Sequence, residues 1–263
     1  MNGLLEVKNL CVGLKEQPSR LIVKHVDFTL RQGKALALVG ESGSGKTMIC
    51  KALMRLLNRK KFEVSGSIRY REVGLLTLKE KEMRSLCGSK MAMIVQHPMT
   101  AFNPTIKIGA QIIESIRAHR KIGKKEAYDI GIQALEQLNL PRCEQLMNSY
   151  CHTLSGGMLQ RIMIAVALIH QPDILIADEA TTALDVKNQS MVLEELDYLK
   201  KRGIALLLIT HDLGVAAKLA DDMVVMKSGE IIERGTVFEL FASPREAYTK
   251  ELLGARLMKG AGL

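Results

Sequence analysis

The sequence predicts an α/β fold in which helices cover a mostly parallel β-sheet. Short, wholly apolar runs alternate with longer helical segments, as in sheets whose strands are buried on both faces. A glycine-rich loop follows the first of these runs directly, as at the strand-to-helix turns of α/β folds. The chain has 263 residues, of which 47% are hydrophobic, enough for a large core. The runs lie at residues 35–39, 91–95, 174–177 and 205–210.

Shorter strands are predicted at the start of the chain, before and around the first buried run. Residues 4–10 and 21–30 alternate apolar and polar side chains, and we expect a loop between them. A helix should follow the glycine-rich loop and extend to about residue 57. Residues 66–70 then resemble a strand, and the charged segment 79–86 a helix.

Residues 97–153 differ in character from the rest of the chain. They are polar, have a helical period and are interrupted by Pro104, Gly109, Gly123 and Pro141, so we expect a helical insertion. An apolar helix at 154–170 follows, after which strands and helices alternate again. The last predicted elements are helices 187–202 and 213–220, a strand at 223–227, a hairpin-like segment at 229–235 and two terminal helices.

Composition limits the classes of partner. The net charge is +9, but the basic residues are dispersed, and runs 58–61 and 119–125 have no aromatic residues among them to stack on bases. We therefore expect no nucleic-acid partner. Five cysteines without a CxxC pair indicate reduced thiols in the cytosol. We find no signal-peptide core and no apolar run of the roughly 18 residues that a membrane span needs.

Residues 40–47, GESGSGKT, match the phosphate-loop pattern G-x-x-x-x-G-K-[ST]. The pattern has its required context, a buried strand before it and a helix after it. Its glycines let backbone N–H groups turn toward the phosphates of ATP, its lysine adds a positive charge, and its hydroxyl contacts Mg²⁺. The predicted nucleotide-binding residues are Gly40, Glu41, Ser42, Gly43, Ser44, Gly45, Lys46 and Thr47.

Polar side chains end three of the buried strands. Asp178 and Glu179 follow 174–177, and we expect Asp178 to hold Mg²⁺ and Glu179 to polarise the attacking water. Gln96 follows 91–95 and is predicted to contact both Mg²⁺ and water, while His211 follows 205–210 and should reach the γ-phosphate. Each signal is weak alone, but the carboxyl ends of parallel strands share one edge of a sheet.

A second glycine-rich segment, LSGGMLQR at 154–161, precedes the apolar helix. Together with GESGSGKT, Gln96, ILIADEATTALD at 174–185 and THD at 210–212, it resembles the nucleotide-binding subunits of ATP-binding-cassette (ABC) transporters, in the order typical of that family. The resemblance covers residues 4 to about 235. It implies an ATPase with a P-loop core and an antiparallel subdomain at 1–96 and 171–235, a helical signature subdomain at 97–170 and a helical tail at 236–263.

The same resemblance implies partners. In this family two subunits form a head-to-tail dimer, so that Ser155, Gly156, Gly157 and Asp185 would contact ATP bound by the neighbouring subunit. A second ATP-binding subunit, identical or different, and two membrane permease subunits are expected, with an extracytoplasmic substrate-binding protein as an indirect partner. The chain would then act as a peripheral protein on the cytoplasmic face of the membrane.

Three segments narrow the cargo to that of the peptide/nickel importer group. QHPMTAFNP at 96–104 and SPREAYTKELL at 243–253 resemble stretches of that group, and Met158 with Leu159 resembles the first ATP-binding subunit of nickel importers. Because the sequence also ends soon after this tail, without a Cys-rich extension, we expect nickel or a nickel chelate rather than peptides, which remain the alternative. No histidine arrangement indicates a nickel site in this chain.

Two departures and one competing class accompany this interpretation. Ala180 replaces the proline that the family usually has after the glutamate, and no aromatic residue lies near Leu14, where one would stack on adenine. Aliphatic packing would replace that stacking. A soluble ABC ATPase of DNA repair or translation is the competing class. It usually has two cassettes or a long coiled-coil insertion, and neither pattern is present here.

Overall fold

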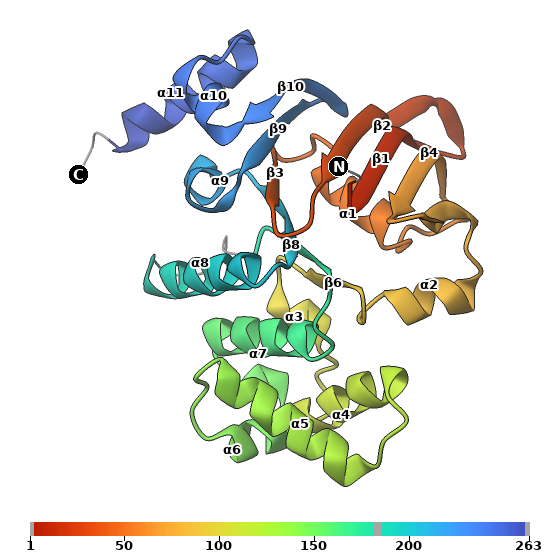
Figure 1. Cartoon of the computed structure of the whole chain (residues 1–263), viewed down its shortest axis with the longest axis vertical. Helices are drawn as coiled ribbons and strands as arrows, with labels where there is room; N and C mark the ends of the chain where they lie inside the picture. Colours follow the sequence, from red (N-terminus) through yellow and green to blue (C-terminus); the bar gives the residue numbers. More distant parts are fainter. Residues whose placement is uncertain (1–2, 181–185, 261–263) are drawn as a thin grey trace. The chain divides into compact units, whose positions relative to one another are not determined.

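The computed structural model describes residues 3–180 and 186–260. The chain divides into two compact units, Met1–Met83 with Leu196–Leu263, and Arg84–Glu195 (Figure 1). Each unit has its own strands and helices. The predicted division at residues 97–170 and 236–263 remains a prediction.

The first unit begins with an antiparallel sheet. Strand β1 (Leu5–Leu14) pairs with β2 (Gln17–Leu30) on one side and with β4 (Phe62–Tyr70) on the other (Figure 1). The loop expected between residues 10 and 21 is much shorter, because the two strands continue to a tight turn between Leu14 and Gln17. Register shifts interrupt the pairing along β1. The short strand β5 (Val73–Gly74) completes the sheet at β4.

The same unit contains the strand that leads into the glycine-rich loop. Every residue of β3 (Ala35–Val39) is buried, and β3 pairs in parallel with β8 (Ala205–Thr210) and β9 (Asp222–Lys227). Strand β10 (Glu230–Thr236) pairs with β9 in antiparallel fashion, as the hairpin-like sequence predicts. Asp221 fixes the start of β3, because its carboxylate accepts hydrogen bonds from the Ala35 N–H and the Lys34 ammonium, both at 2.9 Å.

Helices follow these strands in the expected order. Helix α1 ends four residues earlier than predicted, and α10 begins with a capping box between Thr236 and Glu239. The helical elements of this unit, including two that cross the boundary between units, are α1 (Lys46–Leu53), η1 (Leu75–Thr77), α2 (Glu80–Leu86), α8 (Val186–Lys201), α9 (Leu213–Leu219), α10 (Val237–Ala242) and α11 (Ala247–Gly260).

The second unit contains two parallel strands and the predicted helices. Strands β6 (Met91–Ile94) and β7 (Ile174–Asp178) pair in parallel, and all of β7 is buried. Helix α7 is apolar and largely buried, as its sequence predicts, and it contacts α3 and α5. The helical elements are α3 (Pro98–Ala101), α4 (Ile108–His119), α5 (Lys124–Gln137), α6 (Cys143–Asn148), η2 (Cys151–Thr153) and α7 (Gly156–Leu168).

Both predicted kinds of strand arrangement, parallel and antiparallel, are therefore present, which confirms the α/β fold. Within residues 3–180 and 186–260, no helix has the length and apolar character needed to cross a membrane. All five cysteines lie in the described segments and none forms a disulfide bond.

Candidate functional site

The loop between β3 and α1 has a backbone that only glycine adopts easily. Gly40, Gly43 and Gly45 have φ angles of 152°, 84° and 102°. A Cβ atom on Gly40 would lie 2.2 Å from the carbonyl oxygen of Met226, and one on Gly45 would lie 3.1 Å from that of Ile22. The loop is therefore held closely between the end of β9 and the middle of β2.

Lys46 fills the centre of this loop. Its side chain is only 4% exposed, and its Nζ donates hydrogen bonds to the carbonyl oxygens of Gly40 and Glu41, both at 2.7 Å, and to Ser44 Oγ at 3.1 Å. Helix α1 begins at Lys46 without a side-chain cap on Gly45. A buried ammonium and a helix N-terminus beside a glycine loop form a cradle that fits a phosphate group.

Strand register brings His211 next to this loop. Val39 of β3 pairs with Thr210 of β8, so Gly40 and His211 are the next residues of two adjacent parallel strands. His211 is exposed, and the following Asp212 caps α9 by accepting a 2.7 Å hydrogen bond from the Gly214 N–H. His211 and the start of the predicted phosphate loop therefore lie side by side at the carboxyl ends of β3 and β8, within the first unit.

The second unit brings Gln96 and Glu179 together. Ile94 pairs with Ala177, and each of the two polar residues lies two positions beyond this pair. Gln96 Nε2 donates a 2.6 Å hydrogen bond to Glu179 Oε2. Glu179 has a φ of 48°, an uncommon value for a residue other than glycine, at the sharp turn after β7. The strand ends therefore aim an amide and a carboxylate at each other.

The sequence analysis did not single out Gln160 as a site residue. It lies in α7, is 2% exposed, and its Nε2 donates a 2.8 Å hydrogen bond to the carbonyl oxygen of Ala180. Gln160 therefore connects the signature helix to the residue that follows Glu179. The sequence contained the signal, because glutamine belongs to the quoted LSGGMLQR segment, but the burial that gives it this role was not visible.

The second glycine-rich segment, LSGGMLQR at 154–161, is called the signature segment here and has an open geometry. Ser155 caps α7, and its Oγ accepts a 3.3 Å hydrogen bond from the Met158 N–H. Ser155 and Gly156 are exposed and Gly157 is half-buried, and among the residues that the structure describes a Cβ atom on Gly156 would meet nothing within 4 Å. Asp185, predicted to act with them, lies outside the described residues.

The residues predicted to hold Mg²⁺ offer the right donor chemistry. Thr47 has a hydroxyl, Gln96 an amide oxygen and Asp178 a carboxylate, and Mg²⁺ prefers oxygen ligands. Asp178 is 5% exposed at the end of β7. Thr47 belongs to the first unit and the other two residues to the second.

Phe62 is an aromatic residue beside Leu14, the position near which the sequence has no aromatic residue to stack on adenine. Leu14, at the end of β1, pairs in register with Phe62, the first residue of β4. Paired residues of antiparallel strands place their side chains on the same face, and both are half-buried. Phe62 was missed because it lies 48 positions away in the sequence.

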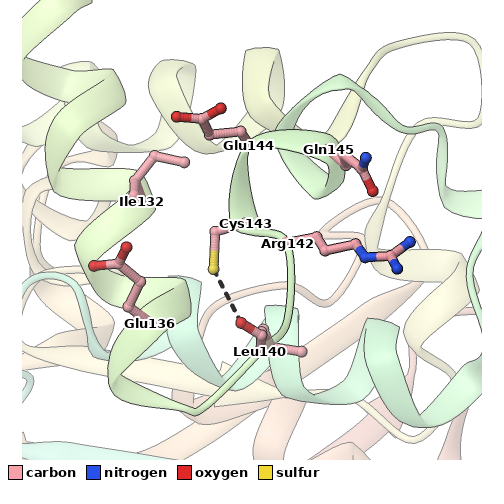
Figure 2. A pocket seen from close by; sticks show the side chains of 7 residues that line it. All are labelled: Ile132, Glu136, Leu140, Arg142, Cys143, Glu144 and Gln145. Atoms are coloured by element: carbon pink, nitrogen blue, oxygen red, sulfur yellow. Dashed lines mark hydrogen bonds between the residues drawn. The ribbon is translucent and has the colours of Figure 1, made fainter.

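A cavity of about 500 Å³ lies in the helical part of the second unit (Figure 2). Cys143, Glu136 and Arg142 are among the seven residues that line it, and none of the motif residues does so. Burial raises the pKa of the Cys143 thiol, as does the nearby Glu136 carboxylate, and Cys143 Sγ donates to the Leu140 carbonyl oxygen at 3.1 Å. This thiol is therefore a structural donor.

Comparison with known proteins decides the family. The pattern that defines the ABC transporter family matches residues 23–182, which include the phosphate loop, Gln96, the signature segment and Glu179. The chain belongs to the ABC transporter family. The predicted ATPase activity and ABC fold are thereby confirmed, and this chain is an ABC ATPase.

Relatives of this ABC ATPase are named for oligopeptide transport and for glutathione import. It is 44% identical over 255 residues to the oligopeptide transport ATP-binding protein OppD of Bacillus subtilis (strain 168), covering 96% of this chain and 71% of that protein. It is 42% identical over 267 residues to the glutathione import ATP-binding protein GsiA of Escherichia coli (strain K12). That match covers 98% of this chain but only 43% of the relative.

Solved structures agree in fold. The dimeric ATP-binding cassette MJ0796, bound to ADP and phosphate, superimposes with a TM-score of 0.77 at 22% identity, covering 89% of this chain and 98% of that one. CbiO1 from Clostridium perfringens, part of the ABC transporter complex cbiONQ, gives a TM-score of 0.76 at 22% identity over the whole of both chains.

Proposed function

We propose that this ABC ATPase hydrolyses ATP to drive the import of di- or oligopeptides. The observation that carries the cargo is the 44% identity to OppD over 96% of the chain. GsiA supports the same cargo chemistry, because glutathione is itself a tripeptide. These relatives favour the peptide alternative over nickel, the cargo that the sequence motifs favoured.

ATP would be held by the first unit. Lys46 would turn its Nζ from the Gly40 and Glu41 carbonyl oxygens to the β- and γ-phosphates, and the N-terminus of α1 would donate backbone N–H groups. ATP would supply the phosphoryl group, and Thr47, Gln96 and Asp178 are the residues expected to hold Mg²⁺, which would neutralise the phosphate charge. His211 would contact the γ-phosphate from the end of β8.

Glu179 is the proposed catalytic base. Its carboxylate would accept a proton from the attacking water, and the Gln96 amide, 2.6 Å away, fixes the orientation of that carboxylate. Gln160 stabilises the turn that carries Glu179 through its bond to the Ala180 carbonyl oxygen. This bond supports the turn at the position where Ala180 replaces the usual proline.

Adenine would pack on the first unit. Leu14 and Phe62 pair across β1 and β4, and together they offer an aliphatic and an aromatic surface. We propose that Phe62 supplies the aromatic contact that no residue near Leu14 provides.

The exposed signature segment would complete the site of a neighbour. Ser155, Gly156 and Gly157, with Asp185, would contact ATP bound by a second ATP-binding subunit. Two membrane permease subunits would hold this pair on the cytoplasmic face, and an extracytoplasmic binding protein would deliver the cargo. The open geometry around Gly156 supports this role, because it leaves room for a ligand from another chain.

Uptake by a strain that lacks this gene tests the cargo. Labelled di- and tripeptides and radioactive nickel are offered in parallel to cells carrying the wild-type chain or Glu179→Gln. We expect the wild type to restore peptide uptake and the variant to restore none. Restoration of nickel uptake alone would favour the second candidate, which Met158 and Leu159 support.

A further inference from the structure

A tyrosine of the C-terminal helix contacts the phosphate loop. Tyr248 lies in the first turn of α11 and is 7% exposed. Its hydroxyl oxygen accepts a 3.2 Å hydrogen bond from the backbone N–H of Glu41, the second residue of GESGSGKT. The two residues are 207 positions apart in the sequence, and both belong to the first unit.

The neighbouring contacts fix the tyrosine ring. Lys227 Nζ lies 4.4 Å from the centroid of the Tyr248 ring, a favourable cation–π distance. Lys227 ends β9, next to Met226, whose carbonyl oxygen closely approaches Gly40. The end of β9 therefore contacts both the ring and the start of the phosphate loop.

The first turn of α11 is also held in place. The Glu233 carboxylate of β10 accepts hydrogen bonds from the Arg245 N–H at 2.8 Å and the Glu246 N–H at 3.2 Å. These bonds satisfy backbone donors at the start of the helix and favour its N-terminal end electrostatically. Tyr248 follows two residues later, so its position is set by β10 as well as by its own helix.

The backbone of Glu41 is thus held on both sides. Its N–H donates to Tyr248, and its carbonyl oxygen accepts from Lys46 at 2.7 Å and from the Ser44 N–H at 3.2 Å. Because Lys46 is the group that must turn to the phosphates, the Tyr248 bond would still orient the Glu41 backbone once Lys46 has turned, together with the Ser44 bond. Burial raises the pKa of Tyr248, as do the Glu41 and Glu251 carboxylates, so the phenol is neutral at physiological pH and accepts as an uncharged oxygen.

We infer that Tyr248 is a positioning residue of the nucleotide site, which ties α11 to the phosphate loop and keeps the loop in its phosphate-binding conformation. This inference rests on the proposed ATP-binding role of that loop. It assigns a function to the C-terminal segment that acts within this chain, separately from any partner. The hydroxyl group carries that function, and the ring supplies the packing.

Tyr248→Phe tests the inference because it removes the hydroxyl and keeps the ring. Tyr198→Phe is the matched control, since Tyr198 is 53% exposed on α8 and also loses only a hydroxyl beside a cation, Arg202. Dissociation constants for ATP and ADP are measured by calorimetry on the purified full chain. We expect Tyr248→Phe to bind both nucleotides roughly three- to tenfold more weakly, the effect of one lost hydrogen bond, and the control to bind as wild type.

Hydrogen exchange of the nucleotide-free chain provides a readout that a general loss of stability does not reproduce. Exchange of the Glu41 amide should accelerate several-fold in Tyr248→Phe while the core amides of β3 and β8 keep the wild-type rate. Tyr248→Met, which keeps apolar volume without a hydroxyl, repeats the comparison in a second background.

Each outcome separates the two proposals. Wild-type nucleotide affinity and wild-type Glu41 exchange in both Tyr248 variants would overturn the role of Tyr248 and leave the proposed function intact. If Tyr198→Phe bound nucleotides as weakly as Tyr248→Phe, the role of Tyr248 would also be overturned. Failure of the wild-type chain to bind ATP would overturn both.

Discussion

Two glycine-rich turns precede helices in this chain, and their geometries differ. In the phosphate loop three glycines have positive φ angles, and a buried lysine fills the centre. In the signature segment neither glycine has a positive φ angle, Ser155 caps α7, and the space around Gly156 is open. Similar compositions therefore build different structures.

The difference lies in how much support each turn receives from its own unit. The phosphate loop packs against groups from β2, β9 and α11 of the same unit. The signature segment presents exposed residues at a helix N-terminus, where the helix dipole favours an anion. Apart from its chain neighbours and the backbone of its own helix, no atom of residues 3–180 and 186–260 lies within 4 Å of a Cβ placed on Gly156. The phosphate loop is therefore held in place within its own unit, whereas the signature segment is open, as expected if it contacts ATP bound by another chain.

Glu179→Gln should produce the largest effect on activity. Loss of a general base typically costs a factor of 10² to 10⁴, so we expect ATP turnover by the assembled transporter to fall at least about 100-fold. ATP binding should persist, because the phosphate loop is unchanged. The variant should therefore accumulate as an ATP-bound pair of subunits, in which the phosphate loop of one subunit faces the signature segment of the other. Size-exclusion chromatography with and without ATP would detect this pair.

Glu126→Gln on the exposed start of α5 is the control for this variant. It makes the same chemical change far from the motifs in sequence and should keep wild-type turnover. Normal hydrolysis by Glu179→Gln would show that another group activates the water.

Gly40→Ala and Gly156→Ala compare the two turns directly. A Cβ atom at Gly40 would collide with the Met226 carbonyl oxygen at 2.2 Å in a backbone conformation that alanine disfavours. We expect the free energy of unfolding to fall by about 2 kcal/mol or more and nucleotide binding to weaken. Gly156→Ala, at the first position of α7, should change the unfolding free energy by less than about 1 kcal/mol.

Urea denaturation of both variants measures this difference. The comparison fails if the two substitutions destabilise the chain equally, because the phosphate loop would then be no more constrained than the signature segment.

Phe62→Leu should have the smallest effect, which should be limited to ATP binding by the first unit. Replacing the aromatic ring by an aliphatic side chain should weaken ATP binding roughly threefold, as expected for a modest stacking contribution. Binding of inorganic triphosphate, which has no base, should be unchanged. Calorimetry with both ligands checks this, and equal weakening for both would remove Phe62 from the adenine contact.

Local patterns predicted most of the fold. The apolar runs that became β3 and β7 are bounded by glycine or charged residues, so their ends were visible in the sequence. The β1–β2 hairpin was predicted less well. Its polar residues 15–20 suggested a loop, whereas backbone pairing with β1 extends β2 to Gln17.

The candidate site was predictable where neighbouring strands end at the same level. The Gln96–Glu179 hydrogen bond and the adjacency of Gly40 and His211 both follow from strand register, which the motif positions anticipated. Tyr248 and Phe62 were not predictable as site residues, and for Gln160 only its place in LSGGMLQR was visible. Their roles depend on contacts between elements distant in sequence, which neither composition nor periodicity encodes.

The proposal that the signature segment completes the ATP site of a neighbouring subunit is tested most directly by Ser155→Arg. The ATP affinity of the isolated variant chain is measured by calorimetry beside the ATPase rate of the transporter assembled with it. We predict wild-type affinity in the isolated chain and loss of hydrolysis in the assembly, because the arginine would block only the neighbour's ATP site. Weakened ATP binding by the isolated chain, with normal hydrolysis in the assembly, would contradict the account.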